Sequence, residues 1–399
     1  MKLHIPRYHW WLWIACVLMI LPMMASCSGT TTQLNNQTSN TFLELLKMQP
    51  DVPLANSLGS PGYILMHDYA KIRDVYGISL PSSSDEKEIN KYLQAILNAD
   101  VSLDTQSPGL FNFVWASGFF VQYLETSNIR SQNVGYGPNN IDASIDISSG
   151  LGLIGTFNPQ ATKNIFNKQD GWSNETKDNY TTENYQDITI NSWGDRTNSG
   201  EIHLRDRLGL PAHDFLGRIY TLAVTQKNVF YSNSVANVKT MIDAKWGKSA
   251  SLADVPKYAT AARGLTELGA YSALISNDMK RDSFEFDSIK KSDTGLAPLL
   301  KPYQAFGSGE GKDDKGLYLA VVLVYNDQKS AADNAGILKA RIDKGTYALG
   351  NTIIAWKQFF INSQINAEGN VVLAKLYFGA GPAVNRINTP FTTPLLLHE

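Results

Sequence analysis

The chain has 399 residues, of which 43% are hydrophobic, so it is long enough to bury a large core. Its 35 basic and 37 acidic side chains give a formal net charge of -2. A nearly neutral chain lacks the broad positive surface that binds nucleic acid, and we therefore expect no nucleic-acid partner.

A secretory signal peptide is predicted over residues 1–26. Lys2 and Arg7 make the start basic, and no acidic residue appears before Glu44. Residues 10–24 then form an almost wholly apolar run, shorter than the about 20 residues that a membrane-spanning helix needs. A basic start, a short apolar region and small residues at its end are typical of secretion signals.

The end of this signal, Met24-Ala25-Ser26-Cys27, resembles the lipobox of bacterial lipoproteins. In that family an aliphatic residue and two small residues precede a cysteine that receives lipid, and Met24 stands where leucine is usual. The resemblance implies cleavage before Cys27, diacylation of its thiol and acylation of the new amino terminus. It also implies that acyl chains such as palmitate hold the protein on the cell membrane or outer membrane, facing outside the cytoplasm.

The alternative for Cys27 is a buried cysteine at the end of an ordinary signal peptide or signal anchor. The polar segment that follows favours the lipid anchor. Residues 27–41 contain one aliphatic side chain, Leu34, and no charge, so we predict a flexible tether. The other cysteine, Cys16, lies inside the signal, so we expect no disulfide in the mature protein. No domain family is identified beyond this signal, and the chain resembles uncharacterised cell-envelope lipoproteins.

The segment 42–140 is predicted to be mostly helical. A first helix ends before Pro50, and residues 69–76 and 86–97 carry further helical patterns of apolar side chains. The apolar run 63–66 favours a strand instead.

Two α+β units are predicted after this segment, over residues 141–285 and 300–399. In each unit an apolar strand leads into a helix, and strand-like segments follow. This order argues against a purely alternating parallel sheet. It favours an α+β fold with mixed, largely antiparallel sheets and helices on one face.

The two units share a short signature. Asn158 and Asn326 each follow an aromatic residue, and Gln160 and Gln328 stand two positions later. We expect each asparagine at the start of a helix, where its side chain would accept a bond from a backbone N–H of the first turn. A duplication explains the match, and so does the general preference for asparagine at helix starts.

Two polar stretches, 170–198 and 308–315, are predicted to be surface loops, the first enclosing one strand. Trp172 and Trp193 fall near the ends of the first loop, where an exposed tryptophan would be a binding anchor. Core positions are expected for the other three tryptophans that follow the signal, Trp115, Trp246 and Trp356.

The titratable residues do not form a recognised catalytic or metal-binding motif. Residues 306–313 lack the required glycine and hydroxyl positions of a phosphate loop. A catalytic role for His67 in a serine hydrolase would require a G-x-S-x-G nucleophile elbow, which the sequence after the signal lacks. Asp68 is expected to start a helix. The densest titratable cluster is interpreted as a charged strand edge and loop rather than as a metal or acid–base site; it comprises Glu201, His203, Asp206, His213 and Asp214.

These patterns favour a lipid-anchored extracytoplasmic protein that acts as a non-catalytic binding or scaffold module. We expect no catalytic residues, metal or cofactor. The membrane is the expected partner through lipid on Cys27, and the sequence names no protein or small-molecule partner. The alternatives are a solute-binding lipoprotein of a transporter, which a deep cleft lined with aromatics would favour, and an envelope hydrolase, which convergent carboxylates or histidines would favour.

Overall fold

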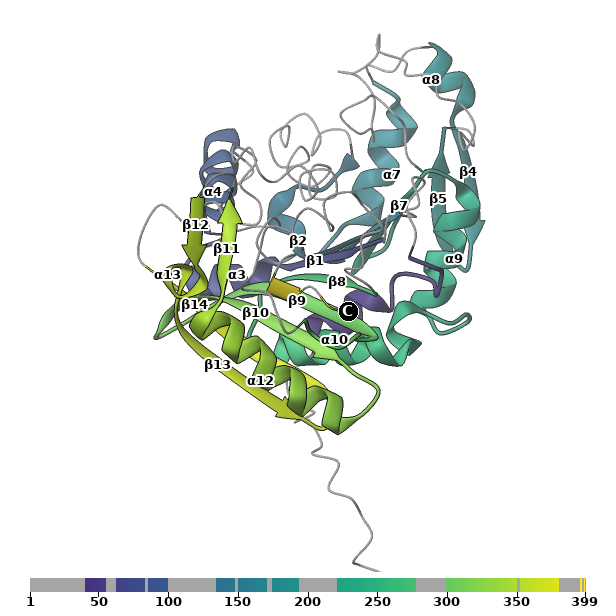
Figure 1. The fold of residues 1–399 in the computed structure, drawn as a ribbon. Helices are drawn as coiled ribbons and strands as arrows, with labels where there is room; N and C mark the ends of the chain where they lie inside the picture. The colour runs from purple at the N-terminus through teal and green to yellow at the C-terminus, as the bar shows by residue number, and fades with distance from the viewer. Residues whose placement is uncertain are drawn as a thin grey trace, which may run out of the picture. The chain divides into compact units, whose positions relative to one another are not determined.

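Antiparallel pairing joins both predicted units into one sheet. The computed structural model describes residues 40–54, 62–82, 85–99, 134–147, 150–170, 174–193, 221–277, 299–349, 352–379, 395–396 and 398. Within these residues a 12-stranded sheet has the order β13-β14-β10-β9-β8-β1-β2-β3-β7-β6-β5-β4, with every neighbouring pair antiparallel. A separate hairpin pairs β11 with β12 (Figure 1).

The strands are β1 (Ile64–Asp68), β2 (Ile141–Ile147), β3 (Gly150–Gly155), β4 (Thr181–Tyr185), β5 (Ile188–Ser192), β6 (Thr221–Val224), β7 (Asn228–Ser232), β8 (Ser272–Ser276), β9 (Ala305–Asp313), β10 (Gly316–Val324), β11 (Thr346–Leu349), β12 (Thr352–Ala355), β13 (Phe360–Glu368) and β14 (Val371–Phe378). The α-helices are α2 (Thr41–Leu46), α3 (Tyr69–Tyr76), α4 (Glu86–Ala99), α7 (Pro159–Lys168), α8 (Asn174–Asn179), α9 (Val235–Lys245), α10 (Pro256–Glu267), α12 (Gln328–Lys344) and α13 (Trp356–Phe359). Short 3-10 turns η2 (Pro138–Asn140) and η4 (Leu252–Asp254) complete the elements.

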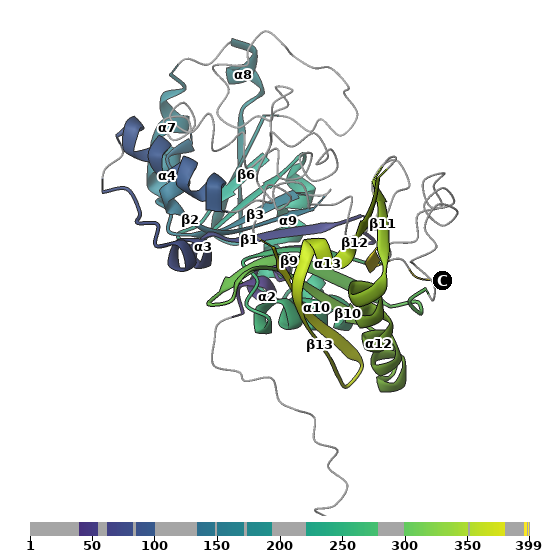
Figure 2. The ribbon, with the colours of Figure 1, turned by 60° about the vertical axis from the view of Figure 1, so that its left-hand side comes forward.

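The predicted α+β class is thus correct, but the expectation that helices cover one face of the sheet is wrong. Helices α2, α9 and α10 pack on one face, whereas α3, α4, α7, α12 and α13 pack on the other (Figures 1 and 2). The central strands explain why. All five residues of β7 and of β8 are buried, so both sides of these strands require apolar cover.

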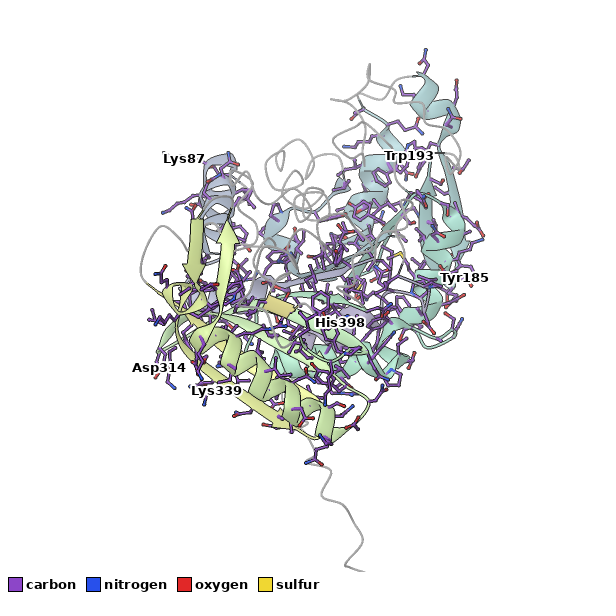
Figure 3. The ribbon with its side chains drawn as sticks, viewed as in Figure 1. Lys87, Tyr185, Trp193, Asp314, Lys339 and His398 are labelled. Carbon is purple, nitrogen blue, oxygen red and sulfur yellow. The ribbon has the colours of Figure 1, made fainter. Side chains whose placement is uncertain are left out.

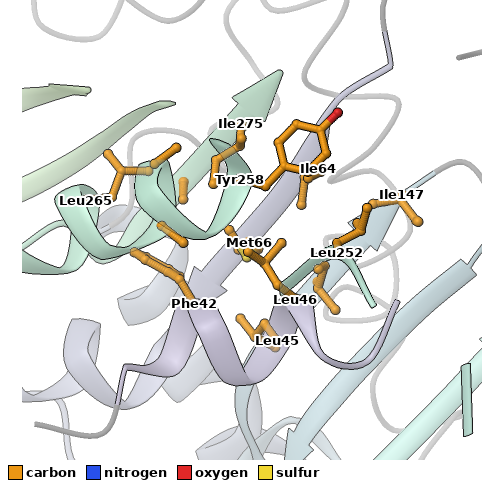
Figure 4. Close-up of a cluster of buried hydrophobic side chains, with 14 of the residues drawn as sticks. Phe42, Leu45, Leu46, Ile64, Met66, Ile147, Leu252, Tyr258, Leu265 and Ile275 are labelled. Atoms are coloured by element: carbon orange, nitrogen blue, oxygen red, sulfur yellow. The ribbon is translucent and has the colours of Figure 1, made fainter. Parts of the chain in front are cut away.

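The first face holds a core that spans the sheet. The apolar side chains of α2, Phe42, Leu45 and Leu46, meet Met66 of β1 and Leu265 of α10 (Figure 4). All five are at most 2% exposed. Burying a side chain of this size contributes roughly 1.5–3 kcal/mol. This cluster therefore ties the start of the described chain to the middle of the sheet.

The opposite face carries two separate apolar clusters. Under α3, α4 and α7, Leu151 and Leu153 of β3 pack with Phe166 of α7. Under α12 and α13, Val321 of β10 packs with Leu338 of α12. Polar side chains of the central strands lie between the two clusters, as described below.

Strand β1 connects the two halves of the sheet. It pairs with β2 on one side and with β8 on the other. The strand expected at residues 63–66 is therefore confirmed, and it is central. Strand β8 of the first predicted unit pairs directly with β9 of the second. The described residues from Asn40 onward belong to one compact unit.

The strands that lead into α7 and α12 occupy corresponding positions. Strand β3 lies between β2 and β7, and β10 lies between β9 and β14. In each half, one neighbour of this strand is the second strand of a hairpin that comes later in the chain: β7 of the β6–β7 hairpin in the first half and β14 of the β13–β14 hairpin in the second. The two helices also pack on the same face of the sheet, and the first half differs by adding β4 and β5 at the edge. This arrangement is compatible with a duplication, which stays a prediction.

The two expected helix starts have different outcomes. Asn158 is the N-cap of α7, and its side chain accepts bonds from the N–H groups of Gln160 (3.1 Å) and Ala161 (3.2 Å). The expectation for Asn326 is wrong by one residue. Asp327 is the N-cap of α12 and accepts a bond from Ser330 N–H over 2.8 Å. The Asn326 side chain instead accepts a bond from the Gln304 amide.

The second predicted loop, 308–315, is mostly strand. Strand β9 continues to Asp313, and only a short turn separates it from β10. Its alternate glycines were the misleading signal. A Cβ atom at Gly309 would overlap the carbonyl oxygen of Ser272, and one at Gly311 would overlap the ring of Tyr318. Glycine is therefore required where the neighbouring strands approach this closely.

Candidate functional site

An open polar pocket lies between α7 and the β4–β5 hairpin. Its volume is about 180 Å³. Every residue that lines it is polar, and most carry amides or hydroxyls. The lining residues are Lys163, Asn167, Tyr180, Thr182, Glu183, Asn184, Thr189 and Asn191.

The hairpin register gathers four of these residues. Thr182 is paired with Asn191, and Asn184 with Thr189. Directly paired residues point to the same side of a sheet, and residues two apart on one strand do as well. The four side chains therefore form one polar patch on the face that α7 covers.

Tyr180 is held in place on three sides. Its hydroxyl donates to Asn191 Oδ1 over 2.8 Å, and Asn191 Nδ2 donates to the carbonyl oxygen of Leu222 over 3.3 Å. Its ring centroid lies 6.2 Å from that of Phe166 and 5.3 Å from that of Trp193. Burial raises the pKa of Tyr180 to about 12, so the hydroxyl stays protonated at neutral pH.

Helix α9 fixes the hairpin from the opposite face. The Tyr185 hydroxyl lies 3.0 and 2.9 Å from the two carboxylate oxygens of Asp243, and the Gln186 amide donates to the same carboxylate. Lys239 Nζ is 2.5 Å from Glu183 Oε1. Figure 3 labels Tyr185, the last residue of β4, and Trp193, which directly follows β5.

The turn of this hairpin has a backbone that L-residues rarely adopt. Gln186 has φ 53° and Asp187 has φ 61°, both in the left-handed region. Two-residue hairpin turns of this kind favour Asn-Gly. The bonds to Asp243 hold the turn in this conformation despite its cost.

A second group of polar side chains lies buried at the centre of the sheet. His67 is paired with Ser144 on one side and with Ser272 on the other, and none of the three is more than 5% exposed. Tyr69 OH lies 3.1 Å from Ser144 Oγ, and its ring stacks on His67 with centroids 5.8 Å apart. Ser272 Oγ accepts a bond from the Glu310 N–H over 3.0 Å.

The neighbouring row of the same face adds Asp146 and Ser308. Asp146 as a residue keeps some exposed surface, but its carboxyl group is surrounded by protein. This burial raises the pKa of the Asp146 carboxyl well above its usual range. Polar groups in such a position are costly unless they are hydrogen-bonded, so this row is the second candidate site.

Several residues singled out from the sequence lie outside the described residues. They are Cys27, Trp115, Trp172, Glu201, His203, Asp206, His213 and Asp214. Asp68 is confirmed as a helix start, since its side chain accepts a bond from Lys71 N–H over 2.9 Å at the N-cap of α3. Within the described ranges, the His, Cys, Asp and Glu side chains form no cluster of three or more that could hold a metal.

The described tryptophans divide differently from the expectation. Trp356 is fully buried, as predicted. Trp246 is 46% exposed, so its expected core position is wrong; it follows the last residue of α9, and its ring centroid lies 5.7 Å from that of Phe230. Trp193 is 1% exposed, so it does not serve as an exposed anchor and instead supports Tyr180.

The individual pocket residues were not identified from the sequence. The polar segment 170–198 marks the region, because Tyr180, Thr182, Asn184, Thr189 and Asn191 all belong to it. Their common orientation depends on a two-residue turn at Gln186-Asp187, which lacks the usual glycine. The signal that could have found them is the alternation of polar side chains on both sides of that dipeptide.

Comparison with known proteins identifies no family. No family model matches the chain, and no curated protein matches it. The chain is similar to two solved structures of TP0453 at 10% sequence identity. Crystal form I covers 88% of this chain and 98% of its own with a TM-score of 0.32, and crystal form III covers 83% and 91% with a TM-score of 0.28. Scores this low support no functional argument.

The next property is the ability of the described helices to span a bilayer. Over the ranges given above, none is both long and apolar enough to cross a membrane.

Proposed function

We propose that this protein is a lipid-anchored extracytoplasmic binding module of the cell envelope, without catalytic activity. The anchor is supported by the basic start, the short apolar run and the Met24-Ala25-Ser26-Cys27 junction. The polar segment 27–41 supports a tether between the lipid and the folded residues.

The observation that carries the binding role is the preorganised polar pocket at α7, β4 and β5. Its lining offers amides and hydroxyls, and the groups of Tyr180 and Asn191 are held in place by hydrogen bonds. Glu183 supplies the one carboxylate among the lining residues, and this group extends to the opposite face of the hairpin, where it is ion-paired with Lys239; the Tyr180 hydroxyl has a raised pKa. Such groups are suited to hydrogen bonding with a ligand and poorly suited to moving protons near neutral pH.

The two alternatives find less support. Two-lobed solute-binding proteins are built from doubly wound parallel units, whereas the described sheet is antiparallel throughout. A hydrolase is favoured by one observation, the juxtaposition of His67 with Ser144 and Ser272. The near-complete burial of these three residues favours a structural role instead.

The anchor is tested by substituting the two cysteines separately in a bacterial host. We expect Cys27→Ser to lose incorporation of a fatty-acid label and to remain unprocessed or appear in the soluble fraction. Cys16→Ser is the matched control, because it removes a cysteine from the signal and should leave labelling and cleavage unchanged. If the Cys27→Ser protein is still labelled, processed and membrane-bound, the lipid anchor is rejected.

A further inference from the structure

The pocket between α7 and the β4–β5 hairpin has a lining whose chemistry defines a ligand class. The side chains of Asn167, Thr182, Asn184 and Thr189 are exposed at its walls. Amides and hydroxyls each present both donors and acceptors. A ligand that matches them must carry several groups that also donate and accept, as the hydroxyl groups of a sugar do.

The charges at the pocket argue against an ionic ligand. The Glu183 carboxylate extends to the α9 face of the hairpin, where Lys239 Nζ lies 2.5 Å from it, so Lys163 supplies the one charged side chain of the lining on the α7 side. Recognition of a carboxylate or phosphate normally uses several cations or a bidentate arginine. The lining contains one lysine and no arginine. A neutral ligand is therefore favoured.

The size of the pocket restricts the ligand further. Its volume of about 180 Å³ is below the ~300–1,000 Å³ that holds a drug-sized ligand. It is also open to the surface. One ring of a sugar fits these dimensions, and an open mouth permits the ring to be one residue of a longer chain.

Tyr180 supplies the aromatic surface that such a ring requires. It lines the pocket, and Phe166 and Trp193 support its ring from the protein interior. The hydroxyl is fixed by its bond to Asn191. One face of a sugar ring carries mainly C–H groups, which pack well against a tyrosine ring. A surface that is already ordered also lowers the entropy cost of binding.

From this lining, its few charged groups, its size and its aromatic support we infer that the pocket binds one neutral sugar ring, free or as a residue of a glycan chain. The inference deepens the proposed function, because it names the ligand class of the same binding module. It does not depend on the lipid anchor.

The experiment measures sugar binding to the full-length protein purified in detergent. Saturation-transfer NMR and calorimetry would be run with glucose, galactose, mannose, xylose and N-acetylglucosamine, and with the trimers maltotriose and chitotriose. Glucose 6-phosphate is the anionic comparator. We expect at least one neutral sugar to bind, and the phosphate to give no increase in affinity. Tighter binding of a trimer than of its monomer would identify a glycan chain as the source of the ring.

Two sets of variants locate the site. The double change Thr182→Ala and Asn184→Ala should weaken binding at least about tenfold, because it removes hydrogen-bonding groups from one wall. Asn167→Ala should weaken binding from the opposite wall. The matched controls are Thr181→Ala, which is adjacent on β4 and does not line the pocket, and Asn164→Ala, which lies on α7 outside the lining. Both controls should bind like the unchanged protein.

The sugar assignment is overturned if none of these sugars binds at about 20 mM. It is also overturned if the pocket variants bind as well as the controls, or if glucose 6-phosphate binds more tightly than glucose. Each result would leave the outcome of the Cys27→Ser experiment unaffected, so failure of the sugar assignment is distinguishable from failure of the anchor.

Discussion

Replacing each of three glycines separately by alanine should change the free energy of unfolding in three different ways. At Gly309 of β9, a Cβ atom would overlap the backbone carbonyl oxygen of Ser272 on the neighbouring strand β8. Backbone atoms of a central strand move only if the strand pairing moves. Overpacking typically costs 1–3 kcal/mol, and we place Gly309→Ala at the upper end, about 3 kcal/mol.

Gly307→Ala provides the nearest comparison on the same strand. There the new Cβ would lie 3.0 Å from Cδ1 of Leu265, which is the end of a flexible side chain. A small rotamer shift relieves this contact, so we expect a cost of about 1 kcal/mol. Gly336 lies on the exposed side of α12 with open space around it. Gly336→Ala should stabilise the protein by about 1 kcal/mol, because alanine is the better helix former.

Urea unfolding followed by far-UV circular dichroism would measure the three free energies from the shifts in midpoint, provided that the slope is unchanged. From most to least stable, the order should be Gly336→Ala, the unchanged protein, Gly307→Ala and Gly309→Ala. If Gly309→Ala costs no more than Gly307→Ala, the close pairing of β8 with β9 is wrong. Residues 308–315 would then be better described as the loop that their composition suggests.

Three further predictions concern single side chains. Asp146→Asn should become more stable relative to the unchanged protein as pH rises above about 4. The reason is that the buried carboxyl has a raised pKa and resists ionisation in the folded state, whereas the same carboxyl ionises freely in the unfolded chain. If the difference in unfolding midpoint between the two proteins is the same at pH 4.5 and pH 7.5, this prediction is wrong. Asn158→Ala should cost about 1 kcal/mol as a lost N-cap, Asp327→Ala should also destabilise the protein for the same reason, and Asn326→Ala should cost clearly less than either in the same urea assay. Asp187→Gly should stabilise the protein by about 1 kcal/mol by relieving the left-handed backbone of the hairpin turn, and an unchanged or lower midpoint would show that Asp187 is not strained.

Helix starts were the most predictable part of the fold, with one instructive error. Asp68 and Asn158 cap helices as expected, since a cap depends on backbone groups two or three residues away. At the second signature the cap is Asp327 rather than Asn326. Both residues suit a cap, and the choice between them depends on Gln304, which donates to Asn326 from the start of the neighbouring β9 segment.

The candidate site was only partly predictable for a related reason. The polar composition of residues 170–198 pointed to the right region. The pocket itself requires Asn184 and Thr189 to face the same way, and it requires Asn167 to approach from α7. Strand register and helix docking are set by contacts across the sheet, which no local pattern reports.

Sequence alone establishes the near-neutral charge, the paucity of cysteine, the α+β order of segments and the helix starts at Asp68 and Asn158, because each depends on composition or on neighbours along the chain. It also predicts the lipid anchor at Cys27. Only the tertiary structure decided that β1 joins both halves into one sheet, that helices cover both faces, and that a glycine-rich segment is a central strand. These features depend on which strands pair and which surfaces meet, and those partners lie far apart in the sequence.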